Sequence, residues 1–289
     1  MELKEYKNEI ELLMGKGTPL SIANFQLNSY LYAMNFIKDN HKVVDFGCGS
    51  AYGINLIKNN TSKFKTKFYG LDIVERTCWK QINGITFLGA DSSLEKYHNY
   101  FDIIINYQVI EHVISPFKLL YLLTQLMKNN GVLLLSTPNK KTALIGDHYD
   151  HYYEFTAKDL KDFLLIFFRN VKIYYQYIRT DDYNEIKKDY KPFPRKIKQM
   201  KNRYKKFAKM LINYNKNNFI ISAENLKLPY KINFFNILDE YYQPKENDNT
   251  ENSIPYVLYA IASGKRREIA HDFIKDNYFR IVPLFRVFS

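Results

Sequence analysis

Three aspartates in the first third of the chain, Asp45, Asp72 and Asp91, each stand at the end of a short apolar run. Parallel strands present their carboxyl ends at one edge of a sheet, so acids in these positions would lie near one another. A carboxylate there can accept both hydrogen bonds of a ribose diol, which predicts a ligand with a nucleoside part. The alternatives are that Asp72 caps a helix and that Asp91 stabilises a turn.

A glycine-rich turn follows the first of these acids. Gly47 and Gly49 flank Cys48, and Gly53 comes four positions later, after a helix start predicted near Ala51. Glycine lets the backbone bend sharply and approach a ligand closely. The dinucleotide fingerprint is G-x-G-x-x-G, whereas this stretch reads G-x-G-x-x-x-G. The spacing therefore favours a cofactor-binding turn of another kind.

Two histidines, His112 and His151, follow predicted strands by a few residues, where ligands of open α/β sheets bind. Histidine suits proton transfer near neutral pH, although either residue could instead orient its loop. His151 also has donors for a divalent cation as neighbours, namely Asp147, His148 and Asp150. A hydrated loop explains this group equally well, and the sequence predicts no metal.

The elements that must position these residues alternate between strands and helices. Seven segments have the composition of strands: residues 43–46, 67–73, 85–92, 101–106, 132–136, 170–178 and 256–262. A helix is predicted over residues 119–127 with its stop at Gly131, and another begins where Thr156 and Asp159 form a capping box. The alternation indicates an α/β fold with a mostly parallel sheet.

Several of these stretches resemble the motifs of one family. Residues 45–49 read D-F-G-C-G, and residues 101–113 fit F-D-x-I-x-x-x-x-V-x-E-H-V. They resemble the first and fourth motifs of class I S-adenosylmethionine (SAM) dependent methyltransferases. H-x-x-E-F-T at residues 151–156 is similar to the small-molecule members that act on ubiquinone precursors or sugars. The resemblance implies a Rossmann-like, seven-stranded, mostly parallel sheet with an antiparallel seventh strand beside the sixth, helices on both faces, and SAM as cofactor.

The resemblance also implies roles for single residues. Asp72 would bind the ribose, Asp91 would accept from the adenine amino group, and the next backbone N–H, at Ser92, would reach an adenine ring nitrogen. The cofactor-binding residues expected are Asp45, Gly47, Cys48, Gly49, Asp72, Ile73, Asp91, Ser92, Asn106 and Gln108. The catalytic candidates are His112 and His151. Methyl transfer is a direct displacement that mainly requires alignment of the reactants and exclusion of water, so no metal is needed.

Outside the core motifs, the chain divides into further regions. We expect a helical N-terminal lid at 1–40, the SAM-binding core at 41–180, a basic insertion forming an acceptor lobe at 181–254, the seventh strand at 255–264 and a C-terminal tail at 265–289. Residues 185–216 contain twelve Lys or Arg but only two acids. Apolar residues three or four positions apart in this segment predict a basic amphipathic helix after Pro194.

Composition limits the partners and the compartment. The net charge of +12 favours an anionic partner, although a lysine-rich composition from an AT-rich genome would produce the same excess. Two cysteines give no disulfide framework, the charged N-terminus is not a signal peptide, and no apolar run reaches the length of a membrane span. We therefore expect a cytoplasmic protein.

The predicted function is methyl transfer to a hydroxyl or amine of a small anionic acceptor, phosphorylated or nucleotide-linked. A nucleotide-linked sugar or another cell-surface glycan precursor fits best, which would place the enzyme in polysaccharide biosynthesis. One alternative is RNA methylation, because basic and tyrosine-rich segments can contact phosphates and stack on bases. Another is a catalytically silent subunit that holds a partner or membrane surface through its insertion and apolar tail.

Overall fold

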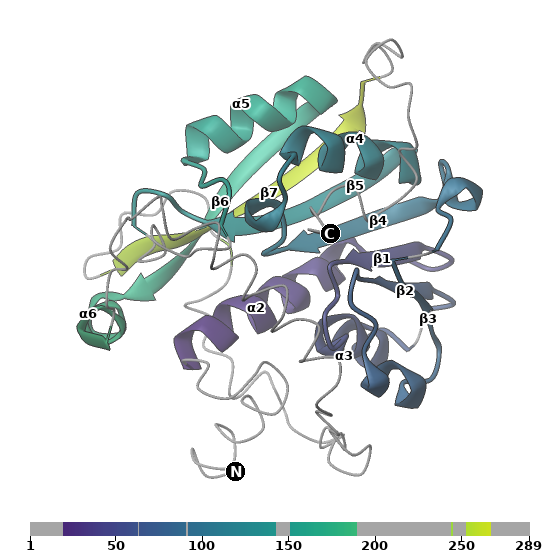
Figure 1. Cartoon of the computed structure of the whole chain (residues 1–289), viewed down its shortest axis with the longest axis horizontal. Coiled ribbons are helices and arrows are strands. Elements are labelled where there is room, and N and C mark those ends of the chain that lie inside the picture. The colour runs from purple at the N-terminus through teal and green to yellow at the C-terminus, as the bar shows by residue number, and fades with distance from the viewer. Residues whose placement is uncertain are drawn as a thin grey trace, which may run out of the picture.

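The computed structural model describes residues 20–62, 64–90, 92–142, 151–189, 244 and 253–266 (Figure 1). Its α-helices are α2 (Leu20–Ala33), α3 (Tyr52–Asn60), α4 (Pro116–Leu126), α5 (Ala157–Phe167) and α6 (Thr180–Asp189). Its strands are β1 (Lys42–Phe46), β2 (Lys67–Leu71), β3 (Ile85–Leu88), β4 (Phe101–Tyr107), β5 (Met127–Pro138), β6 (Phe168–Arg179) and β7 (Ser253–Lys265). Short 3-10 helices are η1 (Met34–Phe36), η2 (Thr77–Gln81), η3 (Glu95–Tyr97) and η4 (Ile110–His112).

The strands form one seven-stranded sheet in the order β3-β2-β1-β4-β5-β7-β6. β1 runs parallel to β2 and β4, and the pairs β2–β3 and β4–β5 are also parallel. β7 lies between β5 and β6 and is antiparallel to both. This topology confirms the predicted Rossmann-like sheet with its antiparallel seventh strand. It also brings the carboxyl ends of β1, β2, β4 and β5 together at one edge of the sheet.

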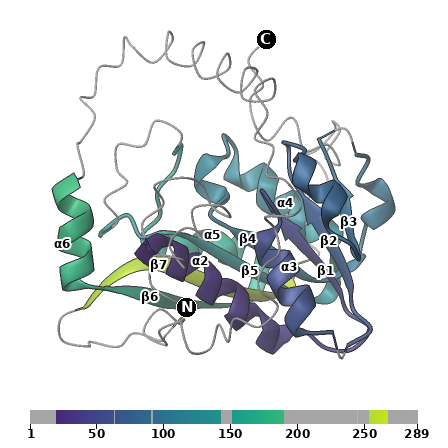
Figure 2. The same ribbon diagram turned by 90° about the horizontal axis from the view of Figure 1, so that it is seen from below.

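Helices cover both faces of the sheet, α4 and α5 on one and α2 and α3 on the other (Figures 1 and 2). The central strands are buried from both sides, which explains their near-continuous apolar sequences. The first hydrophobic cluster includes Leu119, Leu123, Leu160 and Leu164 from α4 and α5. The second includes Leu27, Tyr30, Ile54 and Ile57 from α2 and α3.

Local signals placed one helix boundary correctly and another wrongly. The capping box at the start of α5 is present, with Asp159 N donating to Thr156 Oγ1 at 3.2 Å. The predicted stop at Gly131 is wrong, because α4 ends at Leu126 and the next residues already belong to β5. Met127 is fully buried and pairs with Phe101 of β4, so strand pairing overrides the C-cap pattern. After β4 the chain forms only the single turn η4 before α4 begins.

The described part of the predicted N-terminal lid packs on the sheet. Gln176 of β6 accepts from Ser29 Oγ at 3.2 Å and donates to the carbonyl of Phe25 at 3.0 Å, so polar contacts fix α2 to β6. Tyr107 of β4 donates to the carbonyl of Ser29 at 3.1 Å. All of these groups are buried, which makes α2 part of the helical layer over this face.

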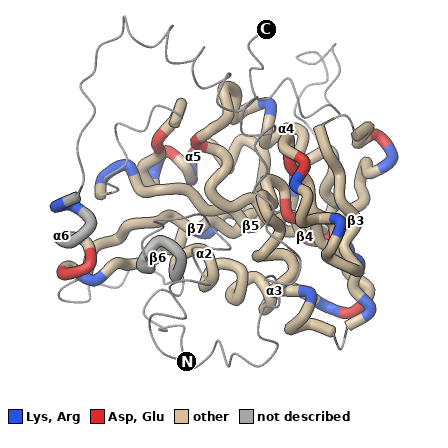
Figure 3. Tube along the Cα trace, turned by 60° about the horizontal axis from the view of Figure 1, so that its bottom comes forward, with Lys and Arg blue, Asp and Glu red and all other residues tan. Residues whose placement is uncertain are grey.

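At the far end of β6, α6 begins the predicted insertion. Acids stand in its first turn and lysines in its last, matching the helix dipole (Figure 3). Asp91, residues 143–150 with Asp147, His148 and Asp150, the predicted basic helix and the tail from 267 lie outside the described residues. No helix in the described part of the chain combines the length and apolarity needed to cross a membrane.

Candidate active site

The glycine turn leaves β1 and crosses the end of β2. The backbone N–H groups of Gly47 and Cys48 both donate to the carbonyl of Leu71, at 2.7 and 3.0 Å. Gly47 has a φ of +94°, and a Cβ there would lie 2.3 Å from a methyl of Val109. Gly49 has a φ of +53° and nothing within 4 Å of such a Cβ. One glycine thus allows close packing, and the other leaves open space above the turn.

Asp72 ties the glycine turn to the loop after β2. Its Oδ2 accepts from the N–H of Gly49 at 2.8 Å, and its Oδ1 accepts from the N–H of Val74 at 3.0 Å. No helix begins here, so the carboxylate is not the helix cap that the sequence left open. Each carboxylate oxygen can accept more than one hydrogen bond, so these contacts leave capacity for ligand hydroxyls.

A groove opens beside this carboxylate, at the carboxyl ends of β1, β2 and β4. It is lined by Phe46, Gly47, Leu71, Asp72, Ile73, Val74, Gln108, Val109 and His112. Five of these were expected from the sequence: Gly47, Asp72, Ile73, Gln108 and His112. The sequence did not single out the apolar wall, which includes Val74 and Val109. A mostly apolar groove with one carboxylate suits a nucleoside with a flat base and a diol.

Trp79 holds the glycine turn through a hydrogen bond, a role that was not predicted from the sequence. Its indole N–H donates to the carbonyl of Gly49 at 2.9 Å, and its ring stacks on Phe87 at 4.7 Å between centroids. Cys48 and Cys78 are buried in the same region, and burial raises the pKa of both thiols. Cys48 therefore packs beneath the turn as a neutral thiol.

Asp45 and Asn106 lie behind the groove. Asp45 is fully buried and accepts from the hydroxyl of Tyr30 on α2 at 3.0 Å. Burial raises the pKa of Asp45 to about 7. Asn106 is also fully buried and donates to the carbonyl of Phe46 at 2.9 Å. Neither side chain lines the groove, so both hold the turn and strand ends that do.

Gln108 and Ser92 occupy two further predicted positions. Gln108 has a positive φ of +54°, and its side-chain amide donates to Ser136 Oγ at 3.2 Å, which fixes it at the groove wall. Ser92 donates from its backbone N–H to the carbonyl of Gly89 at 3.1 Å, just after β3. It is not among the groove-lining residues.

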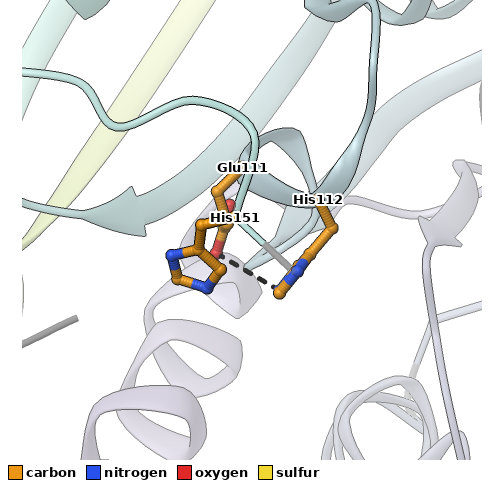
Figure 4. A group of neighbouring side chains, drawn as sticks. All are labelled: Glu111, His112 and His151. Atoms are coloured by element: carbon orange, nitrogen blue, oxygen red, sulfur yellow. Dashed lines mark ion pairs between the residues drawn. The ribbon is translucent and has the colours of Figure 1, made fainter. Parts of the chain in front are cut away.

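The two predicted catalytic histidines meet at the end of the groove, next to a glutamate (Figure 4). The rings of His112 and His151 lie 4.6 Å apart, nearly perpendicular, and His112 Nε2 is 4.0 Å from Glu111 Oε1. Glu111 is 1% exposed, and its Oε2 accepts from Thr137 Oγ1 at 3.0 Å. Its backbone carbonyl accepts from the N–H of Tyr152 at 2.7 Å, which fixes the segment carrying His151.

Glu111 belongs to the motif at residues 101–113, but no role was predicted for it from the sequence. Donor atoms of Glu111, His112 and His151 all lie within 4.8 Å of one another. Among the residues that the structure describes, this is the one group of acids, cysteines and histidines compact enough to hold a metal ion.

A family model described as a methyltransferase domain matches residues 25–190, more than half of the chain. The chain belongs to this methyltransferase family. No curated protein sequence matches it. The match begins within α2 and extends through α6, and it therefore includes the groove and both histidines.

Solved structures with a similar fold include other methyltransferases. A SAM-dependent methyltransferase from Archaeoglobus fulgidus is 19% identical with a TM-score of 0.45, covering 83% of this chain and 94% of its own. Phosphoethanolamine N-methyltransferase 2 from Haemonchus contortus, in complex with SAM, is 15% identical with a TM-score of 0.47. The alignment covers 89% of this chain and 56% of that protein. A Burkholderia thailandensis 1,6-didemethyltoxoflavin N1-methyltransferase is 17% identical with a TM-score of 0.43. The alignment covers 60% of this chain and 83% of that protein.

The methyltransferase is a class I enzyme with SAM as its cofactor. The site fits this cofactor because the open space above Gly49 can admit a ligand close to the backbone of the turn. The carboxylate of Asp72 and the apolar wall suit the ribose and adenine, respectively. When bound, SAM supplies the electrophilic methyl group.

Proposed function

We propose that SAM lies along the groove with its ribose on Asp72 and its amino-acid part over Gly47, Cys48 and Gly49. Ile73 lines the groove next to the predicted ribose position and would contact the nucleoside. Gln108 would border the methyl-bearing end. The sequence-based assignment of Asp91 and Ser92 to adenine is part of this proposal. Asp45 and Asn106 would act on the cofactor indirectly, by holding the turn and the strand ends that line the groove.

The acceptor is a small molecule with a hydroxyl or amine that reacts beside His112 and His151, the two residues assigned to catalysis. One observation carries this proposal: His112 lines the cofactor groove while its ring also contacts that of His151. The pair therefore borders the space that an acceptor must enter to reach the methyl group. Because the transfer is a displacement, the protein has to align the reacting atom with the methyl carbon and sulfur.

Charge near the histidine pair supports an anionic acceptor. Lys140 and Lys141 are exposed where the chain leaves β5. Lys140 donates from its backbone N–H to the carbonyl of Phe155 at 2.9 Å, which places both lysines beside the segment that carries His151. We propose a phosphorylated or nucleotide-linked acceptor, with a sugar nucleotide or glycan precursor as the best fit. A cytoplasmic role in polysaccharide biosynthesis, with the basic insertion as acceptor lobe, belongs to the same proposal.

The test is a screen for S-adenosylhomocysteine (SAH) formation with sugar nucleotides, phosphorylated metabolites and tRNA. A sugar nucleotide or phosphorylated metabolite should turn over, whereas turnover of tRNA alone would replace this proposal with RNA methylation.

A matched pair of double variants then tests the lysines. Lys140→Gln/Lys141→Gln should raise the acceptor KM severalfold and flatten its salt dependence, with SAH affinity unchanged. Lys158→Gln/Lys161→Gln, on the exposed face of α5, is the control and should change neither. An unchanged KM in the first variant would argue against an acceptor charge at this edge.

A further inference from the structure

We infer that Glu111, His112 and His151 bind one divalent cation at the acceptor end of the groove. The three side chains come from two segments, η4 and the stretch before α5, and they point toward one another in Figure 4. No metal was predicted from the sequence, where the only candidate ligands beside His151 were its neighbours along the chain. The structure instead brings His151 to a glutamate and a histidine about forty positions earlier.

The donor set suits a transition-type divalent ion. Two imidazoles and one carboxylate are the ligands of several zinc sites and of mononuclear iron sites. Glu111 Oε1 and His112 Nε2 are 4.0 Å apart, and all three donors lie within 4.8 Å. Ligands about 2.1 Å from a shared ion lie roughly 3.0–3.5 Å apart, so the site needs an inward movement of about 1 Å. The side chain of His112 is 34% exposed and can rotate to supply it.

Contacts around the ligands already orient them. Thr137 Oγ1 donates to Glu111 Oε2, which turns Oε1 toward the two rings. Such partners of ligating carboxylates commonly tune metal sites. The bond from Tyr152 N–H to the carbonyl of Glu111 fixes the backbone next to His151. A carboxylate that is 1% exposed is costly to bury, and a bound cation would offset that cost.

Three protein ligands leave positions on the ion open, and His112 places them at the groove. The catalytic use of the ion rests on the proposed function. A hydroxyl acceptor would bind the ion through its oxygen and release its proton to water. The oxygen then forms a bond to the methyl carbon as the carbon–sulfur bond breaks, and the electron pair stays on sulfur. The products are the methyl ether, neutral SAH and the released proton.

The binding test uses untagged full-length protein, stripped with EDTA and saturated with SAH. Calorimetric titration with ZnCl₂ and with MnCl₂ should show one ion per chain for at least one of the two metals. CoCl₂ should give visible d–d bands without a thiolate charge-transfer band. Glu111→Gln, His112→Ala and His151→Ala should each weaken binding at least tenfold, and Thr137→Val about tenfold. His98→Ala, at an exposed histidine, is the matched control and should bind as the wild type does.

The inference is overturned if the SAH-saturated wild type binds neither ion stoichiometrically, or if His112→Ala and His151→Ala both keep wild-type affinity. A thiolate band with cobalt would move the ion to a cysteine and also overturn it. Thermal unfolding reports whether each variant is folded, and His112→Ala, at the partly exposed ring, keeps the test open if Glu111→Gln does not fold. Stoichiometric cation binding with no acceptor found would support this site and count against the proposed acceptor alone.

Discussion

The buried acid Asp45 offers a test of the site that needs no acceptor. Its pKa is raised from 3.8 to about 7 by burial, while the hydrogen bond from Tyr30 opposes part of the shift. In the unfolded chain the carboxyl has its ordinary pKa near 3.9. Between about pH 4 and pH 7 the folded protein therefore holds a proton that the unfolded chain has released. This group makes the folded state less stable as pH rises through that window, and its effect is constant above it.

Asparagine at this position has nearly the same shape and never ionises. A shift of about three units corresponds to roughly 4 kcal/mol at 1.36 kcal/mol per unit. We expect the stability of Asp45→Asn relative to the wild type to rise by about 2–4 kcal/mol from pH 4 to pH 8. Any fixed cost of the new amide, such as an imperfect contact with Tyr30, is the same at every pH and cancels in this comparison.

The assay is urea unfolding of ligand-free wild type and variant across pH 4–8.5. Asp162→Asn is the matched control, because the side chain of Asp162 is 56% exposed in its pair with Lys158. The control should track the wild type within about 0.5 kcal/mol, as surface substitutions usually do. If the wild type instead gains stability over Asp45→Asn as pH rises from 4 to 7, the folded protein holds Asp45 ionised and the reasoning is wrong.

Three further predictions concern the groove. Asp72→Ala should weaken SAH binding by about 1.5–3 kcal/mol in calorimetry, because the ribose and the N–H of Gly49 both lose a charged hydrogen-bond acceptor. Unchanged affinity would show that Asp72 is not part of the cofactor site. Gly47→Ala should abolish SAH binding, because its Cβ would overlap a methyl of Val109 and its φ is +94°. Adding Val109→Ala should restore binding only in part, since the backbone strain stays. Trp79→Phe keeps the ring but loses the bond to the carbonyl of Gly49, so thermal unfolding should show a loss of about 0.5–1.5 kcal/mol.

Local sequence patterns predicted most of the fold. Strands buried on both faces read as apolar runs, and the capping box at Thr156 and Asp159 is formed by residues three apart. The glycines of the turn also lie within one short segment, so the turn could be predicted from local sequence. The stop at Gly131 failed because the C-cap pattern carries no information about β4, which pairs with Met127 and draws the chain into a strand.

Within the site, the sequence by itself determined the residue types at the strand ends: glycines for the turn, an acid at Asp72, and histidines beyond β4 and β5. Tertiary structure decided which of them meet. Tyr30 reaches Asp45, Trp79 reaches the carbonyl of Gly49, and Glu111 joins His112 to His151. Each pairing depends on how helices and loops pack on the finished sheet. Hydrogen bonds and side-chain contacts of this kind act over a few ångströms, whereas the partners lie 15 to 40 positions apart along the chain, so no local pattern encodes them.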